Sequence, residues 1–127
     1  MSATFTPRLD ILPAPQLKLW PELMTTPNHF TLYGGSAIAL RLGHRQSIDF
    51  DFYSLKTFEP HSLLRDVPYL KGAVIKQSSP NTLTVSIDRG GPILLSFFGD
   101  IDLGQVAAAE LAEGPRIQVA SLLDLAA

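Results

Sequence analysis

The stretch YGGSAIALRLGHRQSIDFDFYS, residues 33 to 54, decides the fold that the sequence predicts. It indicates a strand at residues 29 to 33, a glycine turn, a short helix, a basic loop and a second strand at residues 47 to 53. Local structure and ionic chemistry point to the same task here, because the turn offers free backbone amides and the second strand carries two aspartates. The rest of the chain is expected to support this unit.

The second strand supplies candidate metal ligands. Apolar and polar residues alternate along it, which places Asp49 and Asp51 on one face of the strand and the apolar side chains on the other. At roughly 3.3 Å per residue the two carboxylates stand about 7 Å apart, so they can converge on one or two cations. Ligand sets made only of oxygen suit Mg²⁺ or Mn²⁺ better than zinc. An edge strand with a solvated face is the alternative explanation for two aspartates on one strand.

The glycine turn supplies a candidate phosphate site. Gly34 and Gly35 permit a sharp change of direction after the first strand. Ser36 is then suited to cap a helix at residues 37 to 42, which Gly43 ends. Backbone amides at the start of that helix, together with the Ser36 hydroxyl, make a natural cradle for a phosphate group. A turn that merely connects a strand to a helix is the alternative.

The spacing between the turn and the second strand brings the two candidate sites together. A helix of about two turns and a short loop let the second strand return beside the first, so Ser36 and the aspartates meet at one end of the sheet. Arg41, His44 and Arg45 lie close by in the sequence and could neutralise phosphate charge. Arg45 is the favoured phosphate ligand, because a guanidinium group can grip phosphate oxygens in bidentate fashion. For His44 and Arg45, a solvated loop explains the residues equally well.

The motif GGSAIALRLGHRQSIDFDFYS resembles the nucleotidyltransferase superfamily to which DNA polymerase beta belongs. That superfamily combines a Gly-Gly or Gly-Ser turn with an Asp-x-Asp strand about a dozen residues later. More narrowly, the motif is similar to the AbiEii/AbiGii toxin type, and the likeness continues through PNTLTVSI, ILLSFFG and VASLLDLAA. The resemblance covers most of the chain, and its specific part is the central motif.

The resemblance implies a metal-dependent nucleotidyltransferase. Asp49 and Asp51 would be the catalytic residues and would bind Mg²⁺ or Mn²⁺, while Gly34, Gly35 and Ser36, with Arg45, would hold a nucleoside triphosphate. A nucleoside monophosphate would pass to an RNA or protein hydroxyl, with pyrophosphate leaving. The toxin type further implies an antitoxin protein as a partner.

The superfamily pattern is incomplete in two places. Where relatives carry a third carboxylate on a later strand, this chain has Ser96 in ILLSFF. Relatives also continue past the position of Ala127 into a lysine and further charged helices, so we expect residues 1 to 127 to be one nucleotidyltransferase-like domain, the N-terminal part of a longer architecture. A non-catalytic nucleotide-binding or interaction remnant is therefore the alternative function. A different Asp-x-Asp enzyme, such as a sugar-nucleotide transferase, is a third hypothesis.

Composition excludes several classes of protein. The chain has 127 residues, a formal net charge of −2 and a pI near 5.8, so it has no global attraction for nucleic acid or membranes. It contains no cysteine, which excludes disulfides, thiolate zinc sites and a cysteine nucleophile. No apolar run approaches the roughly 20 residues that span a bilayer. A cytoplasmic protein with no membrane partner is expected.

The predicted fold class is α+β, with a nucleotidyltransferase-like mixed sheet of about five strands and helices packed mainly on one face. The three later strands and the helices around them are read from alternation and turn residues, with Trp20 expected in the core. The strands are expected at residues 29–33, 47–53, 73–77, 83–87 and 93–98, and further helices at residues 16–20, 21–24, 60–66, 106–112 and from 121 onward.

Overall fold

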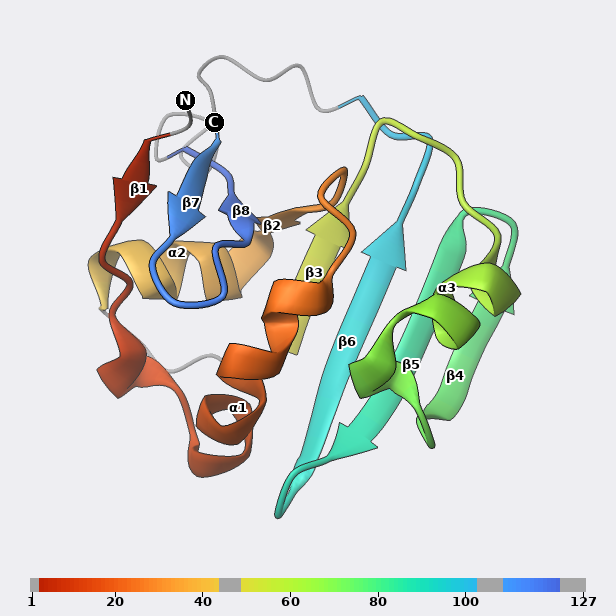
Figure 1. The fold of residues 1–127 in the computed structure, drawn as a ribbon, viewed down its shortest axis with the longest axis horizontal. Coiled ribbons are helices and arrows are strands. Elements are labelled where there is room, and N and C mark those ends of the chain that lie inside the picture. Colours follow the sequence, from red (N-terminus) through yellow and green to blue (C-terminus); the bar gives the residue numbers. More distant parts are fainter. Residues whose placement is uncertain (1–2, 44–48, 103–108, 122–127) are drawn as a thin grey trace.

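The computed structural model describes residues 3–43, 49–102 and 109–121. A mixed sheet of eight strands in the order β1-β7-β8-β2-β3-β6-β5-β4 forms its centre (Figure 1). The strands are β1 (Thr4–Phe5), β2 (Thr31–Tyr33), β3 (Asp49–Tyr53), β4 (Val74–Ser79), β5 (Thr82–Asp88), β6 (Pro92–Phe98), β7 (Glu110–Ala112) and β8 (Gln118–Val119). The helices are α1 (Ala14–Leu19), α2 (Gly34–Leu42) and α3 (Pro60–Asp66), with shorter 3₁₀ turns η1 (Leu9–Ile11), η2 (Trp20–Thr25) and η3 (Pro68–Leu70).

The long strands confirm the predicted hairpin and the return of the second strand. β5 and β6 pair antiparallel around the turn at Gly90, whose φ is +83°. The Asp88 carboxylate accepts hydrogen bonds from the amides of Gly90 and Gly91, so it shapes this turn. β3 lies between β2, with which it pairs antiparallel, and β6, with which it pairs parallel. The aspartate strand is therefore central in the sheet.

The predicted five-stranded sheet is wrong, because the sheet has eight strands. The predicted five strands did not include β1, β7 and β8, each of two or three residues. Residues 116–119 read from the sequence as a short extended stretch, and β8 lies within it. Strands this short cannot show an alternating pattern, and β1 pairs with β7 across more than a hundred residues of chain. The expected helix at 106–112 is also wrong at its end, where Glu110–Ala112 is β7.

The expectation that helices pack mainly on one face is wrong as well. In the view of Figure 1, η2 lies in front of β3 and α3 lies in front of β5, whereas α2 passes behind β7. The helix predicted at residues 60 to 66 is confirmed as α3. The helix predicted from residue 121 falls on residues 122–127, outside the described part of the chain. None of the described helices is long and apolar enough to cross a lipid bilayer.

α2 begins earlier than predicted. It starts at Gly34, directly after β2, so Ser36 lies within its first turn and does not precede the helix as a cap. The helix ends at Leu42 and is followed by Gly43 with a φ of +66°, which confirms the predicted C-terminal signal. The strand and the helix therefore meet without an intervening loop.

One buried cluster joins the sheet to the helices. Phe50 and Phe52 of β3 are fully buried, as their alternation with the aspartates predicted. Trp20 is only 4% exposed and belongs to the same cluster, which confirms its predicted core role. Burial of these aromatic side chains fixes which face of β3 points inward, since a shift of one residue would expose both phenylalanines. The aspartates consequently face the opposite side.

Arg41 fastens α2 to the C-terminal strands. Its side chain is 6% exposed and donates hydrogen bonds to the backbone carbonyls of Val119 and Ala120. It also forms an ion pair with Glu110 and lies 4.1 Å from the centre of the Phe5 ring. A guanidinium with these internal partners holds the fold together. The suggestion that Arg41 neutralises a bound phosphate is therefore replaced by a structural role.

Replacing Arg41 by methionine should destabilise the protein by about 2–4 kcal/mol, because two carbonyls and a carboxylate lose a buried donor. The melting temperature should fall by roughly 10 °C. The exposed pair between Arg65 and Asp66 gives the control, since Arg65→Met should leave the melting temperature nearly unchanged. Equal melting temperatures for the two variants would show that Arg41 does not stabilise the contact between α2 and the C-terminal strands.

Candidate functional site

The two aspartates of β3 lie where the sequence placed them. Asp49 and Asp51 are partly exposed and alternate with buried residues along the strand. In the neighbouring strands, Asp51 is opposite Tyr33 of β2 and Ser96 of β6. The pair thus stands at the centre of the sheet, on the face opposite the phenylalanine core. A solvated edge strand no longer accounts for these two carboxylates, because β3 has paired strands on both sides.

Gly34 brings the start of α2 against one of these carboxylates. Its φ is +78°, a conformation that costs little only for glycine. A Cβ atom on Gly34 would lie 3.2 Å from Oδ2 of Asp51, closer than ordinary van der Waals contact. The absence of a side chain therefore permits both the backbone turn and the approach of the carboxylate. The glycine turn and the aspartate strand, linked in the sequence only by spacing, are neighbours in space.

The surroundings of Asp51 favour a bound cation. Burial raises the pKa of its carboxyl above the ordinary value of 3.8, and the neighbouring charge of Asp49 raises it further. Two close carboxylates, one of them half-buried, carry a repulsion that a divalent cation would relieve. Their oxygen atoms suit Mg²⁺ or Mn²⁺. The residues present therefore fit such an ion.

Other residues that the sequence proposed stay predictions. Gly35 and Ser36 belong to the first turn of α2, beside Gly34, but the Ser36 side chain lies outside what the structure describes. Arg45 and His44 fall in residues 44–48, outside the described ranges. The start of α2 lies beside Asp51 at Gly34, and the first backbone amides of a helix can in general bind phosphate.

Ser96 occupies the position at which the nucleotidyltransferases that the central motif resembles carry a third carboxylate. It is 7% exposed and shares a hydrogen bond of 3.1 Å with the Thr84 hydroxyl. Within residues 3–43, 49–102 and 109–121, no group of three or more acidic or histidine residues could hold a metal ion.

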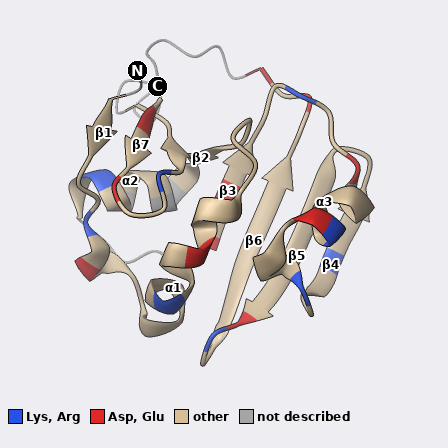
Figure 2. Cartoon of the chain, viewed as in Figure 1, with Lys and Arg blue, Asp and Glu red and all other residues tan. Residues whose placement is uncertain are grey.

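Acidic and basic residues are interspersed along the described helices, strands and turns (Figure 2). The formal net charge of the chain is −2. A polyanionic ligand would therefore have to be held by local contacts.

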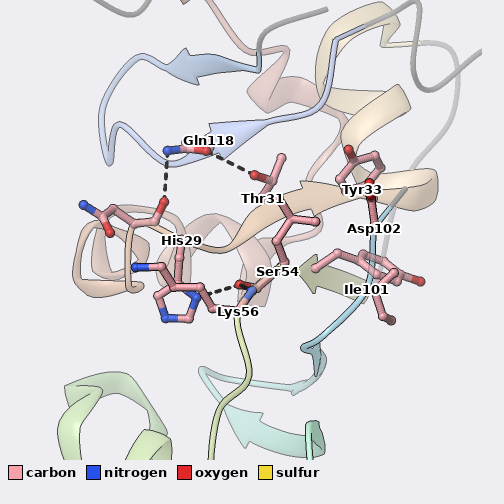
Figure 3. Close-up of a pocket in the computed structure, with 11 residues that line it drawn as sticks. His29, Thr31, Tyr33, Ser54, Lys56, Ile101, Asp102 and Gln118 are labelled. Carbon is pink, nitrogen blue, oxygen red and sulfur yellow. Dashed lines mark hydrogen bonds between the residues drawn. The ribbon is translucent and has the colours of Figure 1, made fainter. Parts of the chain in front are cut away.

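A pocket of about 300 Å³ adjoins the aspartate strand, and sequence reasoning did not find it (Figure 3). Tyr33 and Tyr53 line it beside Ser54 and Lys56, and Asp102 lines it from the segment after β6. These residues come from separate segments of the chain, so no local motif could have indicated their meeting. The one available signal was Tyr53, which lies two residues after Asp51 and therefore on the same face of the strand.

Hydrogen bonds fix the polar wall of this pocket. The His29 Nδ1 atom and the Ser54 hydroxyl share a bond of 2.7 Å, and the Lys56 amide donates to the same hydroxyl. The side-chain amide of Gln118 donates to the carbonyl of Asn28 (Figure 3). Burial, with the nearby charge of Lys56, lowers the pKa of His29 below its ordinary 6.5. The imidazole is therefore neutral at pH 7 and serves as a hydrogen-bonding group.

Comparison with known proteins gives one relative of unstated function. A protein of Aquifex aeolicus (strain VF5), named "Uncharacterized protein aq_aa25", is 38% identical over 73 residues. The matched region covers 56% of this chain and 34% of the relative, so the chain matches about a third of that protein's length. No protein-family model matches the chain, and no solved structure gives a significant match. The functional conclusion accordingly rests on the chemistry of the site.

Two glycine variants test the contact between α2 and the aspartate strand. Gly34 and Gly72 both have a φ of +78°, but a Cβ on Gly72 would meet nothing within 4 Å. Gly72→Ala should therefore cost only the left-handed backbone, about 1–2 kcal/mol. Gly34→Ala should cost more, because the added methyl also displaces Asp51. Chemical denaturation measures both values, and equal losses would show that Asp51 does not depend on this approach.

The raised pKa of Asp51 predicts a stability change with a definite sign. Because the folded state holds this proton more tightly than the unfolded chain, the associated stability is present at low pH and is lost as pH rises through the folded-state pKa. Asp51→Asn should therefore raise the melting temperature at pH 7 without divalent ions. This gain should vanish near pH 3.

The matched control for that measurement is Asp100→Asn. Asp100 is exposed and has a φ of +57°, which asparagine tolerates. Its substitution should leave the melting temperature at pH 7 unchanged. A lower melting temperature for Asp51→Asn than for the wild type at pH 7 would contradict the unfavourable charge pair.

Proposed function

We propose that this chain is the nucleotide- and metal-binding part of a nucleotidyltransferase-like protein, which transfers a nucleoside monophosphate from a nucleoside triphosphate to a hydroxyl group. One observation carries the proposal: the Asp51 carboxylate lies against Gly34 at the head of α2, with Asp49 on the same face of β3. A phosphate-binding helix terminus and a carboxylate pair at one place are the two parts that such chemistry requires.

Each group in the site has a specific task in this proposal. Asp49 and Asp51 would hold Mg²⁺ or Mn²⁺, which on binding offsets phosphate charge and lowers the pKa of an attacking hydroxyl. The amides of Gly34, Gly35 and Ser36 would hold phosphate oxygens and orient the triphosphate. Arg45 would add a bidentate contact to a phosphate group. The chain's own contribution is therefore positioning and charge, which suits phosphoryl chemistry.

The partners follow from the resemblance of the central motif to AbiEii/AbiGii toxins. The acceptor would be an RNA end or a protein hydroxyl, and an antitoxin protein would restrain the activity. The interspersed surface charge supports a short, local contact with the acceptor in place of an extended polyanion surface (Figure 2). A cytoplasmic location is part of the same proposal.

One observation favours a second candidate, a nucleotide-binding protein without turnover. Ser96, hydrogen-bonded to Thr84, stands where related enzymes carry a third carboxylate. Two aspartates would then bind one ion whose remaining positions are filled by phosphate and water. Binding would persist under this candidate, and transfer would not.

A two-part measurement tests both candidates with the full chain. Mg²⁺ and the four nucleoside triphosphates together should raise the melting temperature by several degrees, since a ligand at 100 times its Kd adds about 2.7 kcal/mol. Asp49→Asn combined with Asp51→Asn should abolish this rise, whereas Asp100→Asn should retain it. Transfer of α-³²P-labelled nucleotide to bulk RNA or protein then separates the enzyme from the binding protein.

The outcomes are distinct. Stabilisation with transfer supports the enzyme, and stabilisation without transfer supports the binding protein. No stabilisation by any triphosphate, with Mg²⁺ or with Mn²⁺, would overturn both.

A further inference from the structure

The pocket beside β3 is the part of the molecule that the proposed function leaves unused. Its volume of about 300 Å³ is at the lower end of small-molecule sites. We propose that it binds the nucleoside portion, base and ribose, of the nucleotide whose phosphates meet Gly34 and Asp51. This inference rests on the proposed function for the phosphate end, and on the pocket itself for the nucleoside end.

Position along the strand supports this assignment. Tyr53 follows Asp51 by two residues on the same face of β3, so the two side chains stand roughly 7 Å apart. Tyr33 pairs directly with Asp51 from β2 and lines the same pocket. A ligand with its phosphate at Asp51 therefore needs only a short linker to reach the pocket, and a ribose supplies one.

The pocket has an aromatic wall whose orientation is fixed. The rings of Tyr33 and Tyr53 meet edge to face, with centroids 5.5 Å apart. Tyr53 is also stacked on Phe98 of β6, at a centroid distance of 5.0 Å. Rings held from both sides lose little freedom when a ligand arrives. Flat bases of any sequence bind such platforms, because every base has a π face.

The backbone beneath the pocket is fixed by a continuation of the sheet. Beyond the end of β3, the Ser54 amide donates to the carbonyl of Phe98, and the Ile101 amide donates to the carbonyl of Ser54. The Asp100 amide donates to the carbonyl of Lys56 in the same way. The two segments that line one side of the pocket are therefore joined before any ligand binds. This preorganisation reduces the entropy lost on binding.

The polar groups of the pocket suit a neutral, hydrogen-bonding ligand. Lys56 and Asp102 contribute opposite charges, and His29 contributes a neutral imidazole whose Nδ1 is bonded to Ser54 (Figure 3). A phosphate group would meet the carboxylate of Asp102, which disfavours an anion there. A base and a ribose offer neutral donors and acceptors to these groups. The phosphates therefore belong at the helix terminus and the nucleoside belongs in the pocket.

Two probes separate the ends of the ligand. Isothermal titration in Mg²⁺ with each nucleoside triphosphate measures both ends together, and titration with tripolyphosphate measures the phosphate end alone. Tyr53→Leu should weaken binding of the preferred triphosphate at least about tenfold and leave tripolyphosphate binding unchanged. Tyr53→Phe keeps the ring and should retain affinity within about threefold. Asp51→Asn should weaken both probes.

An exposed residue guards against a folding artefact. Asp102 is exposed, so Asp102→Ala should leave the melting temperature unchanged. It should weaken the triphosphate relative to tripolyphosphate, because the base and ribose lose a hydrogen-bond acceptor whereas a polyanion loses only a repelling charge. Equal affinity of the wild type, Tyr53→Leu and Asp102→Ala for every triphosphate would overturn the nucleoside pocket. Loss of both probes in equal proportion in Tyr53→Leu would overturn it too, since the pocket would then hold phosphate.

Failure of the proposed function has a different signature. Unphosphorylated nucleosides can be titrated into the protein while the NMR chemical shifts of the His29 and Gln118 side chains are recorded. Changes in these shifts report nucleoside binding in the pocket without any phosphate contact. Nucleoside shifts at these residues in a protein that binds no triphosphate would uphold the pocket and overturn the proposed function. If neither nucleosides nor triphosphates change these chemical shifts, both the nucleoside pocket and the proposed function would be overturned.

Discussion

The approach of the Asp51 carboxylate to Gly34 is the constraint on which the candidate site depends. A strand of three residues passes directly into a helix at Gly34. Glycine there allows the φ of +78° and leaves room for the Asp51 carboxylate, whose Oδ2 would lie 3.2 Å from an added Cβ. The register of β3 against β2 decides that Asp51 is the residue at this position. Buried Phe50 and Phe52 set that register, since slippage by one residue would turn the aspartates into the core.

The fold could be predicted where residues repeat a pattern over several positions. Five-residue alternation in DFDFY gave the face of both aspartates, and Gly43 marked the end of α2. The strands β1, β7 and β8 could not be predicted, because two or three residues carry no period and their pairing joins distant parts of the chain. The same limit applied to Arg41, whose position near the motif suggested a phosphate ligand while its partners lie in β7 and just after β8.

The candidate site divides in the same way. The glycine turn and the carboxylate pair lie within one continuous motif, so the sequence alone could indicate both. Its pocket joins residues before β2, after β3, after β6 and in β8, and each of these segments alone reads as an ordinary loop or strand end. Tyr53 links the halves, because the alternation that exposes Asp51 also directs Tyr53 to the same face.

Stability and function oppose each other at β3. A half-buried Asp51 beside Asp49 raises the free energy of the folded state at neutral pH, and a hydrophobic core on the other face of the same strand offsets that cost. A strand with a purely structural role would gain from an uncharged residue at Asp51, as the adjacent strands do from the hydrogen bond between Ser96 of β6 and Thr84 of β5. Under the proposed function, a cation and a phosphate ligand beside Gly34 would remove the repulsion that folding leaves in place.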